Sequence, residues 1–470
     1  MTKCISGFRG SVDYGFGLGF LFRQKHAGAM PHDAPVTRRT FLATTSTFVA
    51  TASLQGMESS PKPAGKIAME GGERAIKESA PPLSRWGEPE REQLNAMLGQ
   101  DTLFYWNGPR AKLLTERFQQ ICPLKYVMPC SSGSAAIHIA IAAAGIAPGD
   151  EVITAPITDI GTVIGIIYQQ AVPVFAALGA HDYNLDPADV ERRITPKTRA
   201  IVAVHLGGNP CDMSALRTLA DKHKLVLIED CAQAWGAQYQ GKPIGALGHI
   251  ACFSLQNSKQ VTCGDGGIVA SSDERFGPAL QKYGDKGFDR LKPTDGFAAF
   301  APNYRMSEPQ AAVAAAQMAR VENMAAKRSH LGSVLSQAIA DIPGIIPHGV
   351  RLEDRCSYYF YMLRMDPKAF RCSRDELAKA IRAEGVPASA GYIRGPLYGE
   401  PVFQNHAFFA GRWPARDLGL TQMDYRQVKC PESEAILATC IRITITEAMS
   451  EDFIRRAGEG IRKVARHFAV

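Results

Sequence analysis

Short apolar segments alternate with segments of helical periodicity along the middle of the chain. The apolar segments are rich in Val, Ile and Ala and have the length of buried strands, whereas the segments between them repeat apolar residues at helical spacing. We predict strands at 126–128, 151–154, 173–175, 200–204, 225–228, 251–253 and 267–270, and helices at 134–144, 162–170 and 213–223. This alternation favours an α/β fold with a mainly parallel sheet covered by helices.

The pattern changes on both sides of this region. We predict a helix beginning at Glu88, a turn at 107–109, further helices at 111–121 and 309–339, and strands at 358–363 and 441–445. The Ala-rich stretch at 309–339 is long enough to connect two structural units. We therefore expect a linker or N-terminal arm over 57–84, a large domain over 85–320 and a smaller C-terminal α+β domain over 321–470.

Residues 1–56 carry the features of an export leader. Arg38 and Arg39 precede an uncharged segment, Ala43 to Leu54, which contains the small-x-small pattern Ala50-Thr51-Ala52. This order resembles a twin-arginine export signal and predicts an exported or periplasmic protein that folds before export. The alternative is an unstructured leader on a cytoplasmic protein. Met30 is an alternative start, because the segment before it fits poorly ahead of such a signal.

Composition argues against several classes of function. The chain has 470 residues, a formal net charge of +7 and 11 cysteines. No run of Lys and Arg is interleaved with aromatic residues, so nucleic-acid binding is not supported. No segment after the leader is long and apolar enough to span a membrane. The cysteines form no C-x-x-C pair and no zinc-like cluster, so we expect them to be reduced and mostly buried.

Two polar side chains at the ends of predicted strands indicate the chemistry. Asp230 ends one apolar run, and Lys259 follows another such run 29 residues further along. A buried carboxylate and a lysine on neighbouring strand ends are what pyridoxal 5'-phosphate (PLP) chemistry requires. The lysine holds the aldehyde as a Schiff base, and the carboxylate keeps the ring nitrogen protonated. Taken singly, Asp230 could cap a helix and Lys259 could be a solvated loop lysine.

The segment Cys130 to Ala136 links the first predicted strand to the first predicted helix. Free backbone N–H groups at a helix start, together with a hydroxyl, form an anion site. The same segment read alone is an ordinary capped helix. Its place ahead of Asp230 and Lys259 gives the chain order of phosphate loop, acid and lysine.

These residues lie within a set of motifs that resembles the DegT/DnrJ/StrS family of PLP-dependent sugar aminotransferases, which have fold type I. The resemblance extends from about Arg85 to the C-terminus. It rests on the ordered segments Gly133–Ala136, Pro148–Ile153, Val204–Gly208, Glu229–Ala234, Phe253–Lys259, Gly264–Gly267 and Asn303–Ser307.

The resemblance implies a role for each matching residue. Lys259 would bind the cofactor covalently and, once a substrate amine displaces it, move the proton between the two carbon centres. Asp230 would pair with the ring nitrogen, and Gln233 would form a hydrogen bond with the phenolic oxygen. The phosphate would be held by Gly133, Ser134 and Ser254.

The resemblance also implies a homodimer with shared active sites. In the family, an asparagine in the motif that matches Asn303 reaches the phosphate of the neighbouring subunit's cofactor. The alternative for Asn303 is a turn residue ahead of a helix that Ser307 caps.

Two positions depart from the family pattern. After Pro156-Ile157-Thr158 the family usually has an aromatic residue that stacks on the cofactor ring, but this chain has Asp159. Either another residue covers the ring, or the loop differs and Asp159 faces the substrate. Asp265 is a milder change, because the family commonly has Glu there.

Several other polar and aromatic residues have weaker claims on function. For His205, a structural role and a substrate contact are equally supported. Tyr392 and Tyr398 match a family segment near the substrate entrance, but loop packing is the better interpretation of each one taken singly. Trp235 and Tyr239 are expected to pack in the core.

The sequence therefore predicts an aminotransferase that works in two half-reactions. Glutamate or glutamine would supply the amino group. The acceptor would be a keto sugar, which we interpret as nucleotide-linked, or a keto-cyclitol. One alternative is a PLP-dependent sugar dehydratase, a branch in which histidine replaces the lysine, so Lys259 argues against it. The other alternative is a non-catalytic sensory protein that keeps the same fold.

Overall fold

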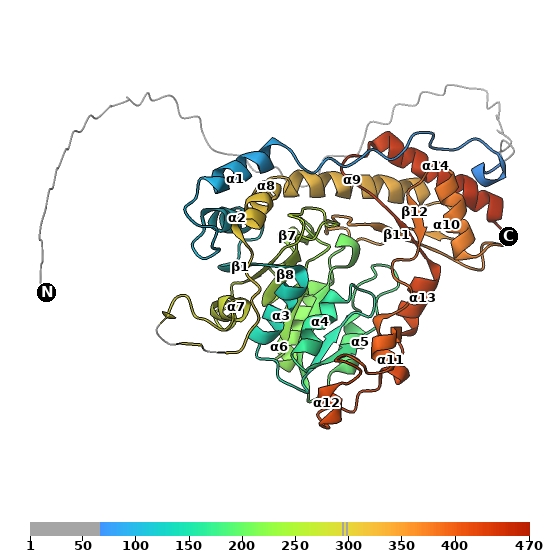
Figure 1. Cartoon of the computed structure of the whole chain (residues 1–470). Coiled ribbons are helices and arrows are strands. Elements are labelled where there is room, and N and C mark those ends of the chain that lie inside the picture. Colours follow the sequence, from blue (N-terminus) through green and yellow to red (C-terminus); the bar gives the residue numbers. More distant parts are fainter. Residues whose placement is uncertain (1–65, 294–295, 298) are drawn as a thin grey trace, which may run out of the picture. The chain divides into compact units, whose positions relative to one another are not determined.

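The computed structural model describes residues 66–293, 296–297 and 299–470 (Figure 1). The predicted leader over 1–56, with its paired arginines and Met30, lies outside the described residues. So do residues 57–65 of the predicted arm. In the part of the chain that the structure describes, no helix has the length and apolar character needed to cross a membrane.

A seven-stranded sheet forms the centre of the larger part of the chain. Its strand order is β1-β9-β8-β5-β4-β2-β3, and the neighbours from β8 to β3 run parallel, whereas β9 runs antiparallel to both β1 and β8. The strands are β1 (Tyr126–Cys130), β2 (Glu151–Thr154), β3 (Val172–Phe175), β4 (Thr198–Val204), β5 (Val226–Asp230), β8 (Ile250–Ser254) and β9 (Gly267–Ser271). The inner strands are buried along their length, as expected for a sheet covered on both faces.

Helices connect and cover these strands (Figure 1), and all of them except α5 and α7 were predicted from the sequence. They are α1 (Glu88–Leu98), α2 (Pro109–Ile121), α3 (Gly133–Ala143), α4 (Gly161–Tyr168), α5 (Pro187–Arg193), α6 (Met213–His223) and α7 (Gly277–Gly284). A short hairpin of β6 (Gln238–Tyr239) and β7 (Lys242–Pro243) lies between β5 and β8 in the chain. The α/β fold with a mainly parallel sheet is confirmed.

The C-terminal part has a separate four-stranded antiparallel sheet. Its order is β10-β11-β13-β12. The elements are β10 (Ile345–Ile346), β11 (Tyr361–Met365), α10 (Arg374–Ala383), β12 (Ala388–Ala390), α11 (Pro401–Gln404), α12 (Pro414–Asp417), α13 (Pro431–Thr439), β13 (Cys440–Ile443) and α14 (Glu451–Phe468). The amphipathic helix α14 buries Phe453, Ile461 and Val464 and packs along α9 (Val321–Ile339) (Figure 1).

The predicted helix over 309–339 is wrong in one respect, because it is two helices. These are α8 (Glu308–Met318) and α9 (Val321–Ile339). At the junction, the amides of Ala319 and Arg320 bond three residues back instead of four, and the Arg320 guanidinium donates to the Arg85 carbonyl oxygen at 2.9 Å. Neither of the two residues between the helices is Gly or Pro, so the sequence pattern does not reveal this interruption.

The predicted strand at 358–363 also differs, because β11 begins only at Tyr361. Tyr358 has a positive φ of 38°. The amides of Ser357 and Tyr359 bond to the carbonyl oxygens of Gly208 and Gly207 rather than to a sheet neighbour. The segment before β11 is therefore attached to a turn of the larger part of the chain.

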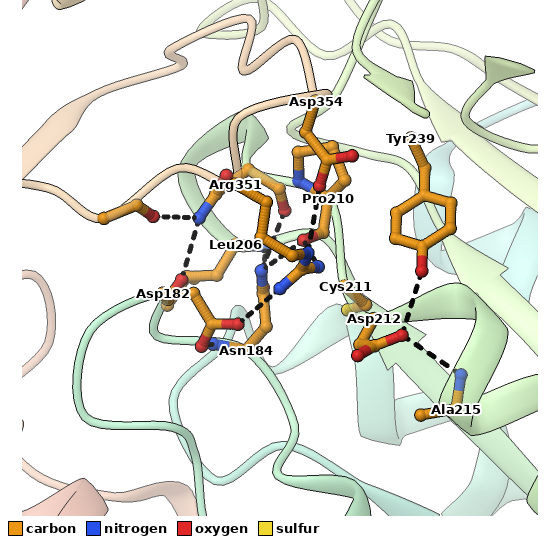
Figure 2. A network of polar contacts seen from close by, with 12 residues as sticks. Asp182, Asn184, Leu206, Pro210, Cys211, Asp212, Ala215, Tyr239, Arg351 and Asp354 are labelled. Carbon is orange, nitrogen blue, oxygen red and sulfur yellow. Dashed lines mark hydrogen bonds and ion pairs between the residues drawn. The ribbon is translucent and has the colours of Figure 1, made fainter. Parts of the chain in front are cut away.

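Arg351 makes a second connection between these regions (Figure 2). Its guanidinium pairs with Asp182 at 2.9 Å and donates to the Pro210 carbonyl oxygen at 2.7 Å. Asn184 donates to the same carbonyl and accepts the Leu206 amide at 3.1 Å. This network stabilises the turn at residues 206–208, and the Gly207 amide of this turn donates to the side chain of Gln233.

The described portion of the predicted arm is a structured element. The amides of Ala68 and Ala75 both donate to the buried carboxylate of Glu384, which pairs with Lys463 at 3.0 Å. Ile67 and Ile76 are buried against the C-terminal helices. This segment therefore packs on the C-terminal part rather than spanning open solvent.

Candidate active site

A cavity of about 350 Å³ lies where β5 and β8 end and helices α3 and α4 begin. Open α/β sheets typically bind ligands at the carboxyl ends of their strands. Five of the seven residues predicted for the site line this cavity, namely Gly133, Ser134, Asp230, Ser254 and Lys259. The structure thus brings together side chains that are 126 positions apart in the chain, from Gly133 to Lys259.

Asp230 is the last residue of β5, and its side chain is buried. β5 pairs directly with β8, and Asp230 lies opposite Cys252. Its Oδ2 accepts the Thr162 hydroxyl at 2.7 Å, and its Oδ1 accepts the Ala232 amide at 3.1 Å. Burial raises the pKa of this carboxyl, although these two hydrogen bonds act in the opposite direction. Among the described residues, no cationic side chain lies within ion-pair distance of it.

Lys259 follows β8 in a tight turn. Its amide donates to the Gln256 carbonyl oxygen at 2.9 Å, and its own carbonyl oxygen accepts the Arg85 guanidinium at 2.5 Å. The side chain is buried, and Nζ lies 4.7 Å from the ring centroid of Tyr359. The backbone of this lysine is therefore held by two hydrogen bonds, and its amine lies over an aromatic ring.

The start of α3 lies at the cavity and presents backbone N–H groups that can bind an anion. The Ser132 side chain accepts the Ala135 amide at 3.0 Å, so the amides of Gly133 and Ser134 remain without intrahelical partners. A Cβ atom on Gly133 would lie only 2.7 Å from the Cβ of Ser254. Glycine thus lets the helix start approach the end of β8 closely, which is the geometry of a phosphate-binding loop.

The other two predicted site residues do not line the cavity. Gln233 is buried next to the cavity-lining Tyr392. Its Oε1 accepts the Gly207 amide at 2.8 Å, and its Nε2 donates to the Tyr392 hydroxyl at 2.9 Å. Asn303 is exposed, and its Oδ1 is 3.4 Å from the Arg305 amide. This local contact supports the turn role for Asn303 and leaves its predicted contact with a neighbouring subunit untested.

Asp159 lines the cavity. This position agrees with the alternative in which Asp159 faces the substrate. Its Oδ1 accepts the Gly161 amide at 2.8 Å at the start of α4. Two tyrosines from the C-terminal part, Tyr359 and Tyr392, also line the cavity and supply its aromatic surface.

Thr162 and Tyr359 line the cavity although neither was predicted as a site residue, and Tyr392 was expected only to pack in a loop. Tyr392 packs on Phe360 with ring centroids 4.8 Å apart, but it also contributes to the cavity wall. No local sequence signal distinguishes Thr162 or Tyr359, whereas Tyr392 lies in the segment that matches the family near the substrate entrance. Only the docking of the segments around β11 and β12 brings the tyrosines to the cavity.

The remaining candidates are structural. His205 is fully buried; its Nδ1 accepts the Cys211 amide at 3.0 Å and its Nε2 is 3.2 Å from Glu229. Because Nδ1 is an acceptor, Nε2 carries the proton and donates to Glu229. Tyr398 pairs with Glu434 at 2.6 Å outside the cavity wall, which confirms its packing role. Trp235 and Tyr239 are buried, as predicted.

Comparison with known proteins assigns the chain to a family. Residues 85–462 match the family model described as the DegT/DnrJ/EryC1/StrS aminotransferase family. The chain belongs to this family. The DegT/DnrJ/EryC1/StrS member described here is therefore an aminotransferase with the fold type I architecture, which confirms the resemblance found in the sequence.

Similar proteins point in the same direction. A Micromonospora echinospora protein named as an L-glutamine:3-amino-2,3-dideoxy-scyllo-inosose aminotransferase is 33% identical over 362 residues, which cover 74% of this chain and 84% of the relative. The GDP-perosamine synthase of Caulobacter vibrioides is 36% identical over 275 residues, or 57% of this chain and 72% of the relative. A solved aminotransferase from Psychrobacter cryohalolentis has a TM-score of 0.73 and 28% identity, covering 83% of this chain and 99% of that chain.

The cavity of this aminotransferase fits PLP, the cofactor expected for the family. The Asp230 carboxylate suits a protonated ring nitrogen, because a buried carboxylate that has no ion-pair partner among the described residues is stabilised by a bound cation. The amides at the start of α3, with the Ser134 and Ser254 hydroxyls, suit a phosphate group. Lys259 lines the same cavity and supplies the amine. The residues present therefore match the three chemical groups of the cofactor.

Proposed function

We propose that this aminotransferase uses PLP to transfer an amino group from glutamate or glutamine to a keto group on a sugar or cyclitol. The observation that carries the proposal is the placement of Lys259 and Asp230 in one cavity with an anion site at the start of α3. Bound PLP would supply an electron sink for the bond changes at the amine-bearing carbon.

Each residue of the cavity then has a distinct task. The amine of Lys259 would hold the cofactor in the resting enzyme and carry the proton between carbon atoms during transfer. Asp230 would keep the ring nitrogen protonated, and the hydrogen bonds from Thr162 and Ala232 fix the orientation of its carboxylate. Gly133, Ser134 and Ser254 would orient the cofactor through its phosphate.

The names of the relatives support both classes of acceptor. One relative is named for a cyclitol ketone and another for a GDP-linked sugar. The first name also specifies L-glutamine as the donor. We propose the same two acceptor classes here, and a screen of nucleotide-linked keto sugars and keto-cyclitols, with either donor, would separate them.

The presence of Lys259 favours transamination over dehydration. A histidine at this position would be the mark of the dehydratase branch, and this chain retains a buried lysine on the cavity wall. Bleaching of the visible band of the lysine-bound cofactor by glutamate or glutamine would support transamination, whereas water loss from a keto sugar without an amino donor would support dehydration.

We also propose that the enzyme acts as a homodimer with shared sites. Asn303 is exposed, and the preceding loop exposes two aromatic side chains, Phe297 at 72% and Phe300 at 106%. Exposed apolar side chains gathered in one loop are typical of an interaction surface. A second copy of the chain would cover this loop and bring Asn303 towards the partner's cofactor.

The central test of the proposed function is Lys259→Ala. We expect loss of the visible band, loss of cofactor attachment after borohydride reduction, and a fall in turnover of about a thousandfold or more, because both the covalent link and the proton carrier are removed. Absorbance spectra, mass spectrometry of the reduced protein and steady-state rates measure these effects. Lys242→Ala is the matched control, since Lys242 is exposed on β7. Full turnover by the Lys259→Ala protein would refute the mechanism.

A further inference from the structure

We propose that Arg85 is a positioning residue for Lys259, because its guanidinium holds the turn that carries the lysine. The inference rests on the proposed PLP function and goes beyond it, since Arg85 is not among the residues that line the cavity. Arg85 lies just before α1 and is 174 positions from Lys259 in the chain. It would act on the reaction through the lysine and not by touching the cofactor or the substrate.

The turn that carries Lys259 is held together internally by Gln256. The Oε1 atom of Gln256 accepts both the amide and the hydroxyl of Ser258 at 2.7 Å. The carbonyl oxygen of Gln256 accepts the Lys259 amide at 2.9 Å. These local bonds set the shape of the turn. They do not fix where the turn lies relative to the surrounding helices, because every partner in them belongs to the turn itself.

Arg85 attaches this turn to a distant part of the chain. Its Nη1 atom donates to the carbonyl oxygen of Asn257 at 3.0 Å and to that of Lys259 at 2.5 Å. One charged nitrogen thus bridges two carbonyl groups, and hydrogen bonds from a charged donor are stronger than those between neutral groups. The other attachment of the turn to the cavity wall is neutral, with 2.7 Å between the hydroxyls of Ser258 and Tyr359.

Arg85 can hold the turn because its own backbone is anchored. Its carbonyl oxygen accepts Nε2 of Gln317 at 2.8 Å and Nη1 of Arg320 at 2.9 Å. Gln317 is fully buried near the end of α8, and the same Nε2 atom donates to the buried Glu90 of α1 at 2.7 Å. Arg85 therefore connects the lysine turn to α1 and to the junction of α8 and α9.

This connection affects the reaction through the position of the Lys259 amine. The amine has to reach the cofactor in the resting enzyme and the reacting carbon atoms during transfer, and a misplacement of about 1 Å can lower a rate about a hundredfold. Without the Arg85 side chain, the turn keeps its internal bonds but loses two contacts that locate it. Donor binding should change little, because Arg85 does not line the cavity.

The experiment measures the first half-reaction, in which glutamate or glutamine bleaches the visible band of the purified holoenzyme. We expect Arg85→Ala to lower the maximal rate of bleaching by about ten- to a hundredfold. The half-saturating concentration of the donor should stay close to the wild-type value. Arg85→Lys should retain more of the rate than Arg85→Ala, because an ammonium group has enough N–H donors for both carbonyl oxygens.

Added guanidinium separates a positioning role from a general loss of structure. Guanidinium chloride, far below denaturing concentrations, should restore part of the rate of Arg85→Ala by bonding to the two exposed carbonyl oxygens. Urea has nearly the same shape without the charge and should restore less. Arg74→Ala is the matched control, because Arg74 donates to the Ala383 carbonyl oxygen at 3.0 Å and does not line the cavity. It should react at the wild-type rate.

Two results would overturn the inference while leaving the proposed function intact. One is an Arg85→Ala holoenzyme that is bleached at the wild-type maximal rate. The other is a slow Arg85→Ala protein that guanidinium does not restore, together with an equally slow Arg85→Lys protein, which would assign Arg85 to the stability of the fold. A wild-type holoenzyme whose visible band neither donor bleaches would instead contradict the proposed function itself.

Discussion

Among the described residues, Thr162 is the one whose side chain forms a hydrogen bond with the Asp230 carboxylate. Its hydroxyl donates to Asp230 at 2.7 Å and lies 2.8 Å from the Thr158 hydroxyl, and both threonines are almost completely buried. We expect Thr162→Val to weaken PLP binding by about tenfold or more, since a hydrogen bond to a charged group contributes about 1.5–3 kcal/mol. Fluorescence titration of the apoenzyme with PLP measures the dissociation constant.

Thr162→Ser is the conservative control for this prediction. It keeps the hydroxyl and should keep the wild-type affinity for PLP, whereas Val keeps the branched shape without the hydroxyl. Thermal unfolding of both variants checks that the fold is retained. An unchanged PLP dissociation constant in a folded Thr162→Val protein would show that this hydroxyl does not support Asp230.

For individual residues, the sequence predicted the position of the site but not the orientation of every side chain in it. Asp230 and Lys259 follow apolar strands, so their positions at neighbouring strand ends could be predicted from pattern alone. Gln233 belongs to the same motif, but the structure turns its amide towards Gly207 and Tyr392 rather than into the cavity. That orientation depends on a turn distant in sequence, which no local pattern specifies.

His348 is a buried titratable group beside β11, away from the cavity. Its Nδ1 accepts the Met362 amide at 3.1 Å, and its ring lies among Tyr183, Tyr358 and Tyr361, with centroids 5.2, 5.4 and 5.5 Å away. Burial lowers the pKa of His348 to about 3. The folded state thus favours neutral imidazole, while the unfolded chain binds a proton near the ordinary pKa of about 6.5.

The stability that His348 contributes should therefore depend on pH. It is complete above about pH 6.5 and decreases as the pH falls towards 3, by at most about 1.4 kcal/mol per pH unit for one proton. Urea unfolding of the holoenzyme at several pH values measures the slope. His348→Asn keeps an acceptor for the Met362 amide without titrating in this range, so its slope should be smaller. Equal slopes for the two proteins would contradict the assignment.

At the scale of elements, periodicity located the strands of the larger sheet and most of the helices around it, but not the interruptions of the predicted elements. The helices over 134–144 and 213–223 were predicted close to α3 and α6, because their apolar residues repeat regularly. The separation of α8 from α9 depends on hydrogen bonds made by Arg320, and the late start of β11 depends on bonds to Gly207 and Gly208. Both are tertiary effects that act on sequences with strong local propensity.

At the scale of the whole molecule, the site combines side chains from segments next to the seven-stranded sheet with side chains from segments next to the four-stranded sheet. Asp230 and Lys259 come from the ends of β5 and β8, whereas Tyr359 and Tyr392 come from segments next to β11 and β12. The order of phosphate loop, acid and lysine predicted the first group. The second group could not be predicted, because it depends on how the segments around β11 and β12 attach to the larger part of the chain.

The proposed homodimer can be tested by combining two defective chains. Lys259→Ala removes the lysine of a chain's own site, and Asn303→Ala removes the residue that we propose contributes to its partner's site. In a mixed dimer, one site would contain the intact Lys259 of one chain and the intact Asn303 of the other. Because isologous dimers exchange equivalent residues across their two-fold axis, the second site would carry both defects.

Mixing the two variants should therefore restore activity. Random pairing in equal amounts makes about half of the dimers mixed, each with one working site, so we expect about a quarter of the wild-type rate. Each variant alone should be far less active, and affinity tags on the two chains allow the mixed dimer to be isolated and assayed. Isolated mixed dimers that are no more active than the single variants would show that Asn303 does not complete the partner's site.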